Sequence, residues 1–154
     1  MRRIVFSLIT TICVSLAQAA EDGRFRAVEI YLESIDPIAA WQFELTDLQG
    51  QMSIVGVENG ESPAFADAPY YDREAVRQGS ADRIVVADFS LAKETDLPRG
   101  RIRLATLHVM MTEPDTTGLS LKLIAATNSS GQAVAARISL SRAADKENHN
   151  DQTQ

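Results

Sequence analysis

The sequence predicts an all-β sandwich of about seven or eight short strands. Apolar and polar residues alternate along several segments, which places one set of side chains on the buried face of a sheet and the other set in water. Other segments are rich in the β-branched residues that strands prefer. Residues that favour turns separate these segments at regular spacing, as in sandwiches built from short strands.

The expected strands follow one another from residue 28 to residue 140. Alternation is strictest at 28–32, 41–46, 119–123 and 134–140, and composition alone indicates strands at 52–57, 83–89 and 101–111. Gly, Pro, Asn or Ser residues at 48–51, 97–100, 113–118 and 128–131 close the strands. Turns therefore separate short strands along most of the chain.

The segment from Gly60 to Ala81 departs from this pattern, because it contains two prolines and many small or charged residues. Asp72 is a suitable N-cap for a short helix over 72–78. A long loop inside a compact domain often carries function. The alternative is a flap that covers one edge of the sandwich, and both interpretations stay open.

Residues 1–20 have the pattern of a secretory signal peptide. Two arginines precede a short apolar run, and small residues around Ala19 and Ala20 fit a signal-peptidase site. The run is shorter than the roughly 20 residues that span a bilayer. We therefore expect a secreted or periplasmic protein with one domain at 21–141. The polar tail at 142–154 has no large apolar residue, and we expect it to be disordered.

The composition excludes several classes of function. Lys and Arg number 15 against 21 Asp and Glu, a net charge of −6, which argues against nucleic acid and anionic membrane surfaces as partners. The single cysteine, Cys13, lies inside the predicted signal peptide. The domain therefore has no disulfide, no thiol nucleophile and no cysteine metal site.

Catalytic motifs are absent from the sequence. His108 lies in an expected strand, where a hydrogen-bonded sheet histidine is the favoured interpretation, and no nucleophile elbow accompanies it. Two carboxylate pairs, Glu44 with Asp47 and Asp67 with Asp72, are the candidates for a glycoside-acting enzyme. Neither pair belongs to a recognisable motif, so we do not expect an enzyme.

Calcium is the only cofactor that the residues leave open. Glu58, Asn59, Glu61 and Asp67 carry oxygen atoms that Ca²⁺ accepts as ligands. They do not form a calcium-loop motif with acidic residues at alternate positions, so the sequence gives this site little support.

Three aromatic residues are the candidate ligand-binding residues. Tyr70 and Tyr71 follow Pro69 in the irregular segment, and exposed tyrosine rings are able to stack on sugar rings. Trp41 is the third candidate, although it shares the phase of Phe43, which favours a place in the core. The two tyrosines have an alternative role as well, that of holding the long loop against the sheet.

The order of the strands resembles that of cohesin domains. The segments that carry the resemblance are VEIYL at 28–32, AAWQFEL at 39–45, SIVGVENG at 53–60, RIVVADFS at 83–90, GRIRLATLHV at 100–109, LSLKL at 119–123 and NSSG at 128–131. The resemblance covers nearly all of the chain after the predicted signal peptide. It implies the nine-stranded jelly roll that cohesins share with family 2 and family 3 carbohydrate-binding modules.

The resemblance therefore implies a secreted, non-catalytic recognition module. The expected fold is a jelly-roll β-sandwich of about eight or nine strands with one short helix in a long loop. Cohesins bind dockerins through one sheet face, and the related modules bind polysaccharide. We expect a protein partner, with an extracellular polysaccharide as the alternative; the oligomeric state stays open. Tyr70 and Tyr71 do not correspond to a known cohesin contact.

Overall fold

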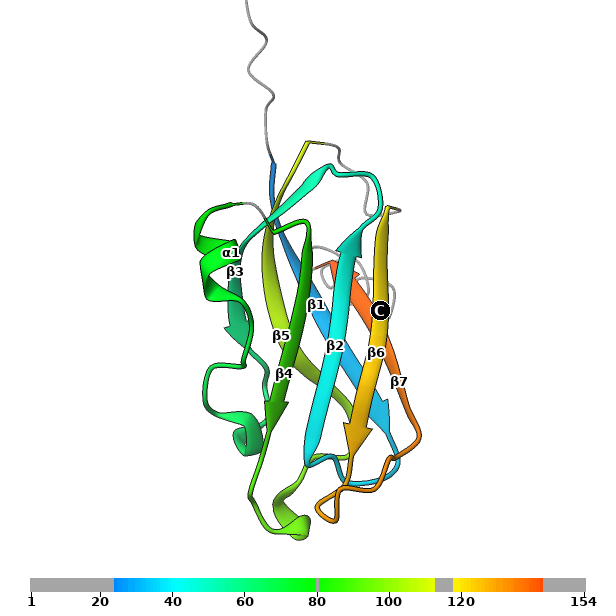
Figure 1. Ribbon diagram of the computed structural model, residues 1–154. Coiled ribbons are helices and arrows are strands. Elements are labelled where there is room, and N and C mark those ends of the chain that lie inside the picture. Colours follow the sequence, from blue (N-terminus) through cyan, green and yellow to red (C-terminus); the bar gives the residue numbers. More distant parts are fainter. Residues whose placement is uncertain (1–23, 80, 113–117, 143–154) are drawn as a thin grey trace, which may run out of the picture.

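The chain is folded into two antiparallel β-sheets (Figure 1). The computed structural model describes residues 24–79, 81–112 and 118–142. The predicted signal peptide lies outside these residues, as does the expected tail apart from Arg142, whose backbone belongs to the last strand. The prediction of an all-β chain with one short helix is confirmed.

One sheet has four strands and the other has three. The elements are β1 (Arg24–Ser34), β2 (Ala40–Asp47), β3 (Met52–Asn59), the 3₁₀ turn η1 (Pro63–Phe65), α1 (Arg73–Arg77), β4 (Arg83–Phe89), the 3₁₀ turn η2 (Glu94–Asp96), β5 (Gly100–Met111), β6 (Leu119–Thr127) and β7 (Ala136–Arg142). The strand orders are β3–β5–β1–β7 and β4–β2–β6. Figure 1 shows the second sheet in front of the first.

The described residues contain seven strands, which agrees with the seven or eight that the sequence pattern predicts and is fewer than the eight or nine of the expected jelly roll. Two segments make single bridges where further strands were possible: Tyr70 pairs with Ala87, and Ala133 pairs with Thr127. In the first segment Pro69 has no N–H to donate to a ladder, so pairing does not extend toward the N-terminus through that residue.

A single hydrophobic cluster draws on both sheets. In β2 the burial alternates strictly, with Trp41, Phe43 and Leu45 buried. The other sheet contributes Val28, Ile30 and Leu32 from β1 and Leu107 and Val109 from β5. Burial of these side chains supplies the main driving force for folding, at roughly 25 cal/mol per Å² of apolar surface.

The segment between β3 and β4 is attached to the sheets at several points. The side chain of Phe65 in η1 is buried and lies edge-on to Trp41, with 5.9 Å between the ring centroids. Val76 of α1 is buried as well. Asp72 caps α1 by accepting the N–H of Ala75 at 3.0 Å, as the sequence predicts. These contacts show that the segment covers part of the core.

Gly60 lies at the start of this segment and passes very close to β5. A Cβ atom at this position would clash with the carbonyl oxygen of Arg103 and come within 2.7 Å of that of Leu104. The next residue, Glu61, donates its N–H to Arg103 O at 3.1 Å and accepts the Arg103 N–H through its carboxylate at 3.0 Å. The close approach of two backbones therefore requires glycine.

We expect Gly60→Ala to lower the free energy of unfolding by about 1–3 kcal/mol, because the added methyl group must displace backbone rather than a flexible side chain. Urea denaturation measures this change. Gly56→Ala is the matched control, since a Cβ there would lie 3.5 Å from the His108 side chain, an ordinary contact distance. Equal stability of the Gly60→Ala variant and the wild type would show that the close approach of the Gly60 backbone to β5 does not require glycine.

Candidate functional site

The outer surface of the three-stranded sheet has a hollow at one end. Alternation along β2 and β4 turns Gln42, Ala87 and Phe89 away from the core, and the register places Gln42 opposite both Ala87 and Ala125. The hollow has a volume of about 270 Å³. We call this surface the β4–β2–β6 face. Its hollow is lined by Ala40, Gln42, Tyr70, Ala87, Phe89, Ala125 and Thr127, and also by Trp41 and Asp88, which occupy the inward positions of their strands.

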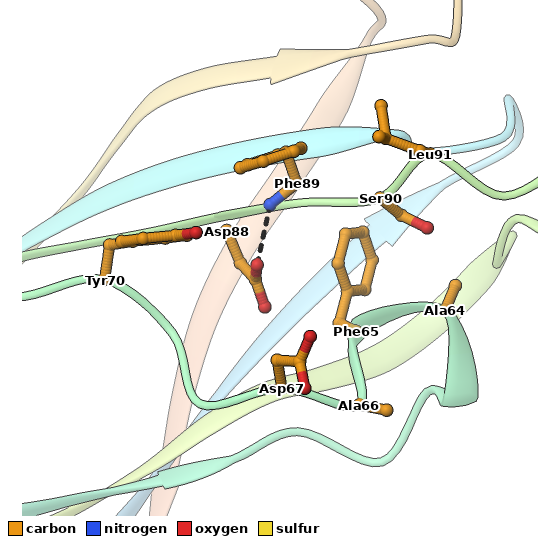
Figure 2. A pocket seen from close by; sticks show the side chains of 9 residues that line it. All are labelled: Ala64, Phe65, Ala66, Asp67, Tyr70, Asp88, Phe89, Ser90 and Leu91. Atoms are coloured by element: carbon orange, nitrogen blue, oxygen red, sulfur yellow. Dashed lines mark hydrogen bonds between the residues drawn. The ribbon is translucent and has the colours of Figure 1, made fainter.

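Tyr70 reaches this face through backbone pairing with β4. Its N–H donates to Ala87 O at 2.8 Å, and it accepts the Ala87 N–H at 3.0 Å. Paired residues point to the same side of a sheet, so the Tyr70 ring emerges beside Phe89, two residues further along β4. The two ring centroids are 6.0 Å apart and the ring planes differ by only 12°. Figure 2 shows both rings edge-on.

Both rings are largely exposed. Tyr70 keeps 61% of its surface accessible and Phe89 keeps 53%. The neighbouring positions Ala40, Ala87 and Ala125 carry only a methyl group, so the rings stand above a shallow floor. Gln42 and Thr127 supply polar groups beside that floor. The arrangement is a rigid apolar platform with a few polar groups, because its backbone belongs to paired strands.

A second cavity adjoins the platform on the side of the irregular segment. It has a volume of about 350 Å³ and shares Tyr70, Asp88 and Phe89 with the β4–β2–β6 face. Figure 2 shows the carboxylates of Asp67 and Asp88 pointing into it, with the ring of Phe65 on one side. We call it the acidic cavity.

Asp88 is the most buried polar residue of the acidic cavity. Only 7% of its surface is accessible, and its Oδ1 accepts the N–H of Phe89 at 2.7 Å. Burial raises the pKa of this carboxyl group, and the nearby charge of Asp67 raises the pKa further, while the hydrogen bond from Phe89 acts in the opposite direction. Within the described part of the chain, no positively charged side chain pairs with either carboxylate.

The three predicted ligand-binding residues lie in three different environments. Tyr70 is on the β4–β2–β6 face. Tyr71 is half-buried against the core, with the guanidinium of Arg73 5.5 Å from its ring centroid. Trp41 is only 2% accessible and stacks on Phe43 at 5.8 Å, so its ring belongs to the core, as its phase in β2 indicates.

Sequence reasoning missed Phe89 and Asp88. The available signal was the phase of β4: Ile84 and Val86 face the core, which turns Phe89 outward. An outward aromatic residue in a strand of alternating polarity is a binding candidate by the same argument that selected Tyr70.

The predicted carboxylate pairs have structural partners. Glu44 pairs with Arg83 on the neighbouring strand. Asp47 is buried and accepts the backbone N–H groups of Gln49, Gln51 and Met52 at the turn after β2. Asp72 is engaged as the cap of α1, whereas Asp67 lines the acidic cavity.

The candidate calcium ligands are dispersed. The Asn59 amide donates to Ala66 O at 2.7 Å, Glu61 binds the backbone of β5, and Glu58 Oε1 lies 2.9 Å from His108 Nε2 without hydrogen-bond geometry. Among residues 24–79, 81–112 and 118–142, no three acidic, histidine or cysteine side chains are grouped as a metal site requires.

Comparisons with known proteins return no match: no family model, no curated protein and no solved structure is significantly similar to this chain. In the part of the chain that the structure describes, no helix has both the length and the apolar character needed to cross a membrane.

We expect Asp88→Asn to raise the melting temperature at pH 7 and to lose this advantage as the pH falls. A raised pKa means that the folded protein binds a proton more readily than the unfolded chain, so the wild type gains stability as the pH falls through that pKa. Asparagine avoids the cost of the buried charge and keeps an oxygen for the Phe89 N–H.

Thermal melts at pH 7 and pH 4 test this expectation. Asp36→Asn removes the same charge from an exposed turn and is the matched control. If the melting temperature of Asp88→Asn rose further above that of the wild type on acidification, the raised pKa of Asp88 would be contradicted.

Proposed function

We propose that this chain is a secreted, non-catalytic recognition module that binds a protein partner through the β4–β2–β6 face. The observation that carries the proposal is the exposed, nearly parallel ring pair of Tyr70 and Phe89 above a floor of alanines. Aromatic residues are enriched at the centres of protein interfaces, where they bury large areas at a small cost in conformational entropy.

The backbone supports a preorganised binding face. Phe89 ends a strand that is paired with β2, and Tyr70 is held by two hydrogen bonds to Ala87. A surface that is already ordered loses little further entropy on binding, so more of the contact energy contributes to affinity. Leu91, 92% accessible, extends the apolar surface beyond the rings.

The proposal includes the fold and the location that the cohesin resemblance implies. The two antiparallel sheets and their shared core are consistent with a cohesin-like β-sandwich of the jelly-roll type. Cohesins bind partners through a sheet face, and the exposed rings lie on such a face. Cleavage near Ala19–Ala20 would release the domain as a secreted or periplasmic protein.

Carbohydrate binding is the second candidate. Two nearly parallel rings suit the apolar faces of sugar rings, and Gln42 and Thr127 are able to hydrogen-bond to hydroxyl groups. Protein recognition is favoured because the floor between these polar groups consists of alanine methyl groups, whereas a sugar ring needs hydrogen-bond partners around its rim.

We do not propose a glycoside-acting enzyme. Acid–base hydrolysis of glycosides uses two carboxyl groups on either side of the scissile bond. Of the predicted pairs, Glu44, Asp47 and Asp72 already serve an ion pair, a turn and a helix cap.

We expect the variants Tyr70→Ala and Phe89→Ala each to weaken binding of the protein partner by roughly 2 kcal/mol, about 30-fold in Kd, as truncation of an interface hot spot does. The partner is first isolated by capture from the secreted and envelope fractions of the source organism, and its Kd is then measured by calorimetry with the purified proteins.

The matched controls are Phe25→Ala and Leu48→Ala, which remove exposed apolar side chains elsewhere on the molecule. Retention of wild-type affinity by both ring variants would refute the proposed face. Retention on insoluble polysaccharide, lost in the same two variants and accompanied by no protein partner, would instead make the chain a carbohydrate-binding module.

A further inference from the structure

The acidic cavity combines carboxylates with apolar walls. Phe65 and Tyr70 contribute aromatic rings, while Asp67 and Asp88 supply the charges. Aromatic ring faces attract cations, and carboxylates accept hydrogen bonds from them. A ligand with a positive end on a hydrocarbon stem therefore matches both kinds of wall.

Asp88 differs from the carboxylates of an exposed acidic cluster because it is buried. It is more than nine-tenths buried, its side chain points into the cavity, and its Oδ2 accepts no hydrogen bond from the described residues. A buried carboxylate whose charge is not compensated is costly, and the raised pKa of Asp88 reflects this cost. A positively charged group of another molecule would remove this cost.

We infer that the acidic cavity receives a lysine or arginine side chain of the protein partner. The inference rests on the proposed function and specifies the chemistry of the partner. The volume of about 350 Å³ is near the lower end for ligand cavities, ~300–1,000 Å³, which suits a single side chain. The stem would lie along the rings of Phe65 and Tyr70 while its charged end meets Asp67 and Asp88.

Position on the surface supports the same partner. The cavity shares Tyr70, Asp88 and Phe89 with the β4–β2–β6 face, so one partner surface is able to cover both. The chain is acidic overall, with a net charge of −6, and attracts a basic surface electrostatically. We therefore expect a basic residue beside an apolar patch on the partner.

A titration of the ¹⁵N-labelled protein with Nα-acetyl-lysine amide and Nα-acetyl-arginine amide tests the cavity without the partner. We expect saturable chemical-shift changes confined to the amides of residues 65–67 and 88–91. Nα-acetyl-norleucine amide, which has a similar stem but no charge, should leave these amides unchanged. An equal response to norleucine, or a response to the basic probes elsewhere on the protein, would overturn the inference.

The double variant Asp67→Asn/Asp88→Asn should weaken binding of both basic probes at least about tenfold, because each carboxylate contributes a charge-assisted hydrogen bond. The Asp88→Asn substitution retains an oxygen for the Phe89 N–H, which favours normal folding. The control Asp36→Asn/Asp82→Asn removes the same total charge from exposed positions and should bind the probes as the wild type does. Unchanged binding in the cavity variant would overturn the inference.

Binding measurements with the isolated partner distinguish a failure of this inference from a failure of the proposed function. If the basic probes fail to bind while Tyr70→Ala still loses the partner, only the cavity inference is wrong. If the ring variants and the cavity variant all retain the partner, the β4–β2–β6 face is not the docking surface and the inference fails with it.

Discussion

Two backbone hydrogen bonds between Tyr70 and Ala87, 2.8 and 3.0 Å long, attach the irregular segment to the edge of β4, and the candidate site depends on them. They turn the Tyr70 ring to the same side as Phe89 and bring Asp67 to the cavity that Asp88 faces. They also occupy part of the edge of β4, which would otherwise offer unpaired backbone groups to another chain. This pair of backbone hydrogen bonds thus positions both the Tyr70 ring beside Phe89 and Asp67 in the acidic cavity.

The core explains why this bridge forms where it does. Phe65, five residues before Tyr70, is buried edge-on against Trp41, so the segment is anchored on both sides of Asp67. The alternation that buries Trp41 and Phe43 also turns Ala40 and Gln42 outward onto the β4–β2–β6 face. The packing of the core therefore also positions the side chains of the β4–β2–β6 face.

The sequence alone predicts much of this framework. Alternation identified the core phase of β2, and the capping residue Asp72 identified the helix that the structure shows at Arg73–Arg77. The pairing of Tyr70 with Phe89 was not predictable in the same way, because it joins a loop to a strand 19 positions away and no local pattern encodes it. Alternation also did not indicate that Tyr31, which lies between the core residues Ile30 and Leu32, is buried as well, with the Arg101 guanidinium 3.5 Å from its ring centroid.

Site-specific photo-crosslinking tests whether the partner binds at the β4–β2–β6 face. A benzophenone amino acid replaces Phe89 in one variant and Phe25, an exposed residue of β1, in the other. Each variant is irradiated in the presence of the isolated partner. We expect crosslinks from position 89 and none from position 25. Crosslinks from position 25 alone would place the partner on the four-stranded sheet and refute the proposed binding face.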